Sequence, residues 1–167
     1  ITESWNGSSW TEVGDMNTGR RQLSGAGASN TSALAFGGES PGAANEAKAE
    51  SWDGSSWTEV GDLNTGRRFN MGAALTSSNA LGTGGYNGSS YIANNESWDG
   101  TSWTEVGDLN TARNDSAVGG AFTSTATLCI GGNLPGGVTA VNELWNGSSW
   151  TEVADLNTAR MNQGGSG

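Results

Sequence analysis

The sequence contains no histidine, one lysine, one cysteine and two prolines. Without histidine, neither a Ser-His-Asp nor a Cys-His catalytic site is possible, and the commonest metal ligand is missing. We therefore expect a protein that is not an enzyme, with no catalytic residues, no bound metal and no cofactor. The single cysteine, Cys129, has no partner for an internal disulfide, and we expect it to act as a small buried apolar residue.

Positive charge is also scarce, because seven Lys and Arg residues stand against seventeen Asp and Glu residues, for a net charge of -10. Recognition of a phosphate backbone requires a basic surface, so nucleic acid is not an expected partner. Lys48 is the only lysine, and no apolar run approaches the length of a membrane span. Neither a basic patch for anionic lipid nor membrane insertion is therefore expected.

Glycine is abundant, with 28 residues, and serine, threonine and asparagine fill much of the remainder. This composition is typical of short strands joined by many turns. Eight tryptophans at regular spacing indicate that apolar surface is buried at regular intervals, which argues against disorder. A length of 167 residues suits a single domain.

A segment covering residues 3–13 recurs almost unchanged from Glu50, Glu96 and Glu143. Each copy holds two tryptophans, and corresponding tryptophans are 46 or 47 residues apart. One arginine also recurs in each repeat. Residues that are present in every repeat are expected to build the frame, with the tryptophans in the core between repeats. These expected structural residues are Trp5, Trp10, Trp52, Trp57, Trp98, Trp103, Trp145, Trp150, Arg20, Arg67, Arg113 and Arg160.

An aspartate precedes each recurring arginine by five residues, and we expect salt bridges or turn hydrogen bonds between them to tie the loop. These aspartates are Asp15, Asp62, Asp108 and Asp155.

Local turn chemistry predicts strands rather than helices. Asn-Gly or Asp-Gly stands between the paired tryptophans, which is the strongest short hairpin signal. In one repeat this predicts strands at 47–52 and 56–60, followed by a loop. A strand of small residues follows, 23–28 in the first copy, where close backbone approach is expected. An apolar strand ending in Gly-Gly then completes four strands per repeat, which predicts an all-β protein.

The order of these features resembles the kelch repeat, with an Arg-led inner strand, a second strand ending in Gly-Gly and a later tryptophan near the outer strand. The resemblance covers the whole chain, although the tyrosine usual in kelch repeats is replaced by the first tryptophan of each pair. It implies a β-propeller of four kelch-like, four-stranded repeats of about 47 residues. Galactose oxidase also carries kelch repeats, but its copper ligands include histidine, so that activity is not implied.

Residues 51–57 also look like the Asp box of sialidase propellers with one residue missing before the glycine. Sialidases need a cluster of arginines for the substrate carboxylate, whereas the recurring arginines here occur once per repeat. The recurrence favours a structural role.

Residues 1–167 are predicted to form a single kelch-like propeller domain or a propeller fragment, one strand short of four complete blades. We expect third and fourth strands in 1–18, blades at 19–65, 66–111 and 112–158, and an inner strand in 159–167. The terminal blade is then split and carries unpaired edges, which recruit other chains. Homo-oligomerisation through the split blade is therefore expected.

The loops after Gly-Gly differ between repeats, at residues 39–44, 86–91 and 133–138. Alternation of the strands places these loops on one face and the Asn-Gly turns on the other. Variable loops on a repeated frame are candidates for specificity, and the only two tyrosines lie in one of them. The candidate ligand-binding residues are Glu39, Tyr86, Asn87, Tyr91 and Asn133.

Two functions follow as hypotheses. The first is a non-catalytic binding module, outside a cell or on a virus particle, that recognises a glycan or a protein through the variable loops. The alternative is a purely structural repeat unit, designed or cut from a longer repeat or viral fibre protein, that closes its propeller by oligomerisation.

Overall fold

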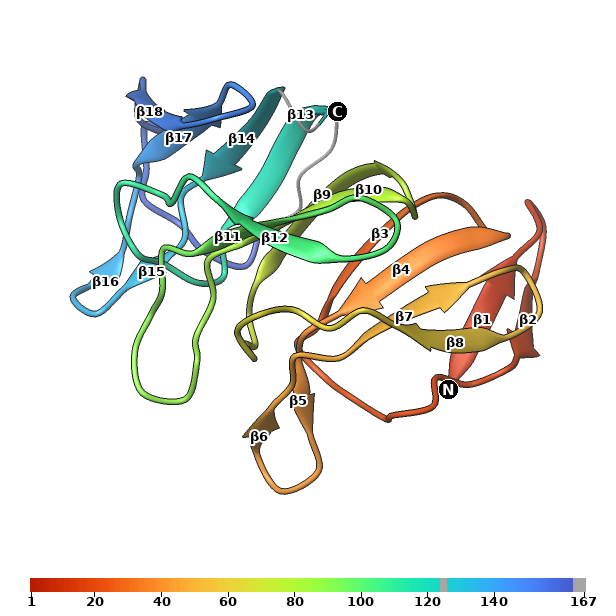
Figure 1. Ribbon diagram of the computed structural model, residues 1–167. Coiled ribbons are helices and arrows are strands. Elements are labelled where there is room, and N and C mark those ends of the chain that lie inside the picture. Colours follow the sequence, from red (N-terminus) through yellow and green to blue (C-terminus); the bar gives the residue numbers. More distant parts are fainter. Residues whose placement is uncertain (124–125, 164–167) are drawn as a thin grey trace.

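The computed structural model describes residues 1–123 and 126–163, and within these ranges the regular structure consists of strands without helices (Figure 1). Three antiparallel four-stranded sheets follow one another along the chain. The first sheet contains β3 (Ser24–Ser29), β4 (Ser32–Phe36), β7 (Ala49–Trp52) and β8 (Trp57–Val60). The second contains β9 (Met71–Thr76), β10 (Asn79–Thr83), β11 (Asn95–Trp98) and β12 (Trp103–Val106). The third contains β13 (Ala117–Thr123), β14 (Ala126–Ile130), β17 (Asn142–Trp145) and β18 (Trp150–Val153).

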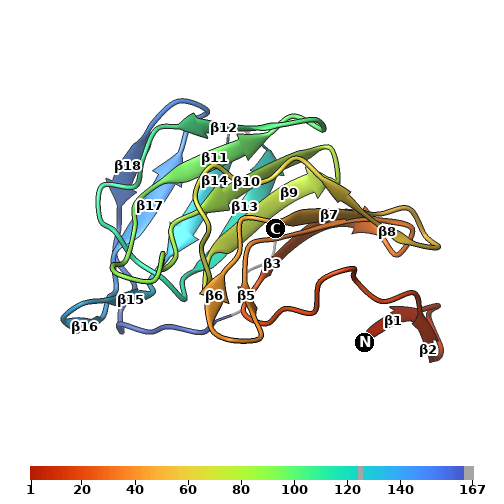
Figure 2. The ribbon, with the colours of Figure 1, turned by 60° about the horizontal axis from the view of Figure 1, so that its bottom comes forward.

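The first strands of the three sheets, β3, β9 and β13, lie side by side, so the sheets are arranged like the blades of a propeller (Figure 2). Small residues allow this approach. A Cβ atom added to Gly72 would lie 3.0 Å from the carbonyl oxygen of Gly25 and 2.9 Å from the ring of Phe36. A larger residue at position 72 would therefore force β3 and β9 apart.

The turn between the two outer strands of each sheet is fixed by its own residues. In the first sheet the carboxylate of Asp53 accepts hydrogen bonds from the amides of Ser55 and Ser56, both at 2.8 Å. Gly54 has a φ of 97°, and the turn aligns Trp52 with Trp57 across the strand pair. The side chains of Asn6, Asp99 and Asn146 likewise accept a hydrogen bond from the backbone amide two residues later in the equivalent turns. Asn87 does the same in the turn of the 86–91 loop.

The core lies between consecutive sheets. One cluster joins the first and second sheets and includes Leu34, Phe36, Trp98 and Trp103, where the rings of Phe36 and Trp103 are 4.8 Å apart. A second cluster joins the second and third sheets and consists of Met71, Ala73, Leu81, Leu109, Cys129, Trp145 and Trp150. Each sheet is therefore stabilised by its neighbour, as in other repeat architectures.

Cys129 is fully buried in the second cluster. This burial raises the pKa of its thiol to about 11.

The chain begins with a separate two-stranded sheet of β1 (Thr2–Trp5) and β2 (Trp10–Val13). Its register repeats that of the outer pair in each larger sheet. Within the described residues, no strand pairs with the other edge of β1. Trp5 and Trp10 are 43% and 64% exposed, whereas Trp98 is 2% exposed. The prediction of a buried core position is therefore wrong for Trp5 and Trp10, because no inner strands cover them here.

The inner strand predicted near the C-terminus is not present in residues 159–163. In the three larger sheets the inner strand begins four residues after the recurring arginine, at Ser24, Met71 and Ala117. The equivalent position, and the rest of that predicted strand, fall in residues 164–167, outside the described ranges.

The variable loops contain short hairpins that the sequence did not predict. Residues 39–45 form β5 (Glu39–Ser40) and β6 (Ala44–Asn45), and residues 133–138 form β15 (Asn133–Leu134) and β16 (Gly137–Val138). Tyr86 and Tyr91 form an isolated bridge in the second variable loop, residues 86–91. The two hairpins and the 86–91 loop project from the same side of the sheets (Figure 1). Among the described residues, none lies in a helix long and apolar enough to cross a membrane.

Candidate ligand-binding face

The first residue after each Gly-Gly pair is held in the same backbone position. Glu39 exchanges two backbone hydrogen bonds with Arg21, at 3.0 and 2.8 Å. Tyr86 exchanges the same two bonds with Arg68, at 3.0 and 2.8 Å. Asn133 does so with residue 114, at 3.1 and 2.8 Å. The frame thus fixes three equivalent backbone positions, and the sequence places a different side chain at each.

The glutamate at the first of these positions is tied to two arginines. Glu39 is 3% exposed, and its carboxylate accepts a hydrogen bond of 2.7 Å from Nε of Arg21. The Arg68 guanidinium forms a second ion pair with the same carboxylate. Arg68 also lies over the ring of Tyr86, 5.2 Å from its centroid. The side chain of Arg68 therefore connects the first variable loop to the second.

The tyrosines continue this chain of contacts. The rings of Tyr86 and Tyr91 meet edge to face with centroids 5.8 Å apart. The Tyr86 hydroxyl donates to the carbonyl of Gly88 at 2.9 Å. The side-chain Nδ2 of Asn133 donates to the Tyr91 hydroxyl at 3.0 Å. Contacts thus run from the first variable loop to the third through one continuous group, the loop-face cluster, which consists of Arg21, Glu39, Arg68, Tyr86, Tyr91 and Asn133.

The structure thus brings together four of the five candidate residues, and the fifth, Asn87, stabilises a turn. Asn87 accepts hydrogen bonds from the amides of Ser89 and Ser90, both at 3.0 Å, and so shapes the turn that carries the tyrosines. Arg21 and Arg68 are not among the candidate residues predicted from the sequence. A signal was available, because arginine doublets stand before the first two inner strands, whereas the third and fourth repeats have Arg113-Asn114 and Arg160-Met161.

Three of the recurring arginines, Arg20, Arg67 and Arg113, lie beneath this face and belong to the frame. The side chains of Arg20 and Glu50 are both 0% exposed and form an ion pair of 2.8 Å. Arg67 pairs with Glu96 at 2.5 Å in the same way. Arg113 and Glu143 form the third such pair.

The predicted pairing of these arginines with the aspartates five residues earlier is wrong. The guanidinium groups of Arg20, Arg67 and Arg113 turn into the sheets, and the exposed Arg160 forms no ion pair within the described residues. The aspartates are exposed on the loops: Asp15, Asp62, Asp108 and Asp155. Asp15 instead accepts a hydrogen bond of 2.7 Å from the amide of Thr2. Burial raises the pKa of the Glu50 carboxyl, but hydrogen bonds from Asn17 and the charge of Arg20 outweigh this effect and hold the pKa below its usual value.

The loop-face cluster offers hydrogen-bonding groups and aromatic edges. Its one carboxylate is occupied by two guanidinium groups. In the part of the chain that the structure describes, no group of three or more Cys, Asp or Glu side chains could hold a metal ion. A cavity of about 360 Å³ lies beside the cluster, lined by Gly19, Arg20, Arg21, Glu39, Ser40, Pro41 and Gly42.

Comparison with known proteins gives a structural match only. No protein-family model matches this chain, and no curated protein sequence matches it. Among solved structures, the chain is similar to that described as "Structure of YjhT", with a TM-score of 0.75 and 16% sequence identity. The match covers 92% of this chain and 58% of the YjhT chain, so this chain spans somewhat more than half of that structure. At this identity the likeness shows a shared fold.

Proposed function

We propose that this chain is a non-catalytic binding module, built of kelch-like propeller blades, that recognises a glycan or a protein through the loop-face cluster. The observation that carries the proposal is the equivalence of positions 39, 86 and 133. Their backbones are held by matching pairs of hydrogen bonds, while their side chains are Glu, Tyr and Asn. A rigid frame with differing side chains on adjacent loops is the usual arrangement of a recognition surface.

Recognition fits the chemistry of the cluster better than catalysis does. A general base needs a free lone pair and a tuned pKa, whereas the Glu39 carboxylate is buried and bound by Arg21 and Arg68. The sequence offers no histidine to replace it. Tyrosine rings, an amide and guanidinium groups supply contact area and hydrogen bonds at low entropic cost, which suits a polar macromolecular ligand.

The test is a parallel screen of the wild-type chain against a glycan array and a displayed peptide library. Tyr91→Ala and Asn133→Ala should weaken binding to the selected ligand by at least about tenfold, which corresponds to about 1.4 kcal/mol. Asn146→Asp is the matched control, because it changes a turn on the opposite face and Asp occupies the equivalent position in Asp53 and Asp99. Equal binding by all variants, or turnover of a bound glycan, would overturn the proposal.

A second candidate function is a self-assembling repeat unit whose split terminal blade is completed by another chain. It is favoured by the exposure of Trp5 and Trp10, whose counterparts Trp98 and Trp103 are buried. It is also favoured by a cavity of about 840 Å³ between the β1–β2 hairpin and the first sheet. Native mass measurement tests it: a discrete oligomer supports assembly, and a monomer at all concentrations contradicts it.

A further inference from the structure

The frame contains a hydrogen-bond network that recurs from sheet to sheet. In the first copy, the loop before the sheet surrounds the carboxylate of Glu50. The backbone amide and the side-chain amide of Asn17 donate to Oε2 at 2.7 and 2.9 Å. The amide of Thr18 and the guanidinium of Arg20 donate to Oε1 at 3.3 and 2.8 Å. In the second copy, the equivalent groups of Asn64, Thr65 and Arg67 donate to the carboxylate of Glu96. In the third copy, Asn110 and Arg113 donate to the carboxylate of Glu143.

Three carbonyl groups complete each acceptor set. One is that of Gly37, directly after β4, which accepts from Arg20 at 2.9 Å; the other two lie in or next to the outer strand pair. The carbonyl of Lys48, two residues before Glu50, accepts from Arg20 at 2.6 Å. The carbonyl of Trp57 accepts from the side chain of Asn17 at 2.9 Å. An outer strand pair therefore carries most of the acceptors by itself.

Arg67 and Arg113 of this network each join two consecutive sheets. Arg67 is docked by its backbone on the first sheet, because its amide donates to Glu46 at 3.0 Å and its carbonyl accepts from Gly38 at 2.8 Å. Its guanidinium binds Glu96 of the second sheet. One residue thus holds the preceding sheet and the following sheet together.

At the C-terminal end, the donor half of this network is present without its acceptor. The amide of Arg160 donates to Thr139 at 3.2 Å, and its carbonyl accepts from Gly132 at 2.8 Å. Asn162 has a φ of 54°, close to the 52° of its counterpart Phe69. The loop therefore has the conformation found in the complete networks. The Arg160 side chain is exposed and, within the described residues, forms no ion pair.

At the N-terminal end, the acceptor half is present without its donors. Glu3 of β1 lies opposite Glu12, as Glu50 lies opposite Glu59 in the first sheet. Glu3 is exposed, whereas Glu50 is 0% exposed. No ion pair involves Glu3 within residues 1–123 and 126–163. The positions of the two acceptor carbonyls in or next to the outer strand pair are filled by Ile1 and Trp10.

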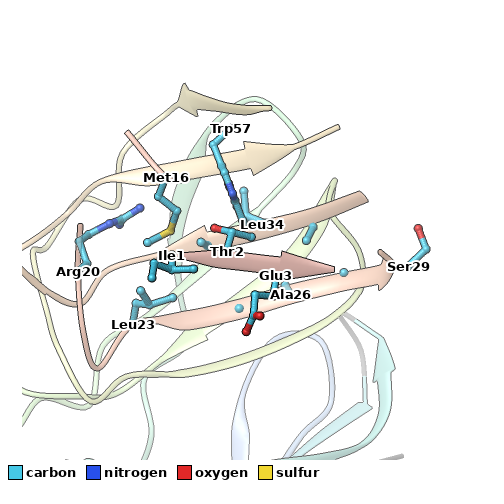
Figure 3. Close-up of a pocket in the computed structure, with 14 residues that line it drawn as sticks. Ile1, Thr2, Glu3, Met16, Arg20, Leu23, Ala26, Ser29, Leu34 and Trp57 are labelled. Carbon is cyan, nitrogen blue, oxygen red and sulfur yellow. The ribbon is translucent and has the colours of Figure 1, made fainter. Parts of the chain in front are cut away.

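The acceptor half faces open space. Ile1, Thr2 and Glu3 form one side of the 840 Å³ cavity. Ala26 and Leu34 of the first sheet, with Leu23 just before β3, line another part of it (Figure 3). The hairpin is held beside that sheet by a hydrogen bond of 3.3 Å from Asn30 to the carbonyl of Trp5. The hairpin therefore lies at one end of the row of sheets, while Arg160 is docked on the sheet at the other end (Figure 2).

We infer that the two halves meet between copies of this chain: Asn157 and Arg160 of one copy bind Glu3 and the carbonyls of Ile1 and Trp10 of a second copy. This inference rests on the second candidate function and names its contacts. The occupant is a second copy because the cation and the carboxylate are complementary halves of a network that the same chain completes three times. Two copies joined reciprocally would complete both half-networks in a closed dimer.

The test uses sedimentation velocity of the full 167-residue chain at micromolar concentrations. Wild type should form a discrete oligomer. Glu3→Arg and Arg160→Glu should each raise the dissociation constant at least tenfold, because each places like charges at both junctions. An equimolar mixture of the two variants should restore association, since one junction then carries the reversed pair and the other the natural pair.

Controls separate this inference from a loss of folding and from the broader proposal. Glu105→Gln removes an exposed carboxylate from β12 of the second sheet, away from both half-networks, and this variant should associate like wild type. Circular dichroism should show native strand content in every variant. A wild-type chain that stays monomeric would overturn both self-assembly and this inference. An oligomer that is unaffected by either charge reversal, or is not restored by mixing, would overturn this inference alone.

Discussion

Replacing Trp103 with alanine should strongly destabilise the protein, and replacing Trp10 should not. Trp103 is 5% exposed and packs against Phe36 and Trp98, at centroid distances of 4.8 and 5.4 Å. Burial of about 200 Å² of indole surface at about 25 cal/mol per Å² amounts to about 5 kcal/mol. Because the pocket can partly collapse, we expect a loss of about 3–5 kcal/mol for Trp103→Ala. Trp10 is 64% exposed, so Trp10→Ala should cost less than about 2 kcal/mol by the same area estimate.

The assay is urea unfolding followed by circular dichroism, at a protein concentration low enough to keep the chain dissociated. The two variants have the same chemical change, so the difference in their unfolding free energies reports the difference in burial. Equal destabilisation by the two substitutions would refute the assignment of Trp103 to a core between sheets. So would an unchanged unfolding curve for Trp103→Ala together with a loss of ligand binding, since that result would make the tryptophan a ligand contact.

Three further predictions concern buried or hydrogen-bonded groups. Glu96→Gln leaves the Arg67 guanidinium buried without its counterion and should lower the unfolding free energy by about 3–5 kcal/mol in the same urea assay; a change below about 1 kcal/mol would contradict it. Cys129, with a thiol pKa of about 11, should react with a disulfide reagent at neutral pH only after denaturation; rapid reaction of the native protein would contradict its burial. Hydrogen bonds from the amides of Ser56 and Ser55 lower the pKa of Asp53 to about 2. The stability contributed by the ionised Asp53 carboxylate is thus complete above the unfolded pKa of about 3.9 and is lost as the pH falls through 2. Titration of this carboxyl followed by NMR should give a pKa near 2; a pKa of about 4 would contradict the prediction.

Features that depend on a few neighbouring residues could be predicted from the sequence. The Asp53-Gly54 turn and its two flanking strands follow from a requirement for positive φ, which is local. The glycines of the inner strands likewise predicted close backbone approach, which the environment of Gly72 confirms. By contrast, β5 and β6 have two residues each, too few for an alternating pattern to identify them.

Features that depend on distant residues were predicted less well. The partner of Arg20 is Glu50, thirty residues away, whereas Asp15 is near in sequence but faces solvent. Trp10 has nearly the same local sequence as Trp103 but a different environment, because burial is supplied by neighbouring strands. Variation between repeats made Glu39, Tyr86 and Asn133 candidates, but not the arginines that contact the first two, because those contacts exist only after folding.

The central proposal is that repeated residues build the frame and the variable loops bind the ligand. The most direct test is a titration of the isotope-labelled chain with the ligand selected in the screen, followed by backbone amide chemical shifts. We predict that the largest shifts fall in residues 39–45, 86–91 and 133–138, with the Asn-Gly turns at 6–7 and 146–147 unchanged. Shifts concentrated on those turns or on the paired tryptophans, with the three loops unaffected, would contradict it.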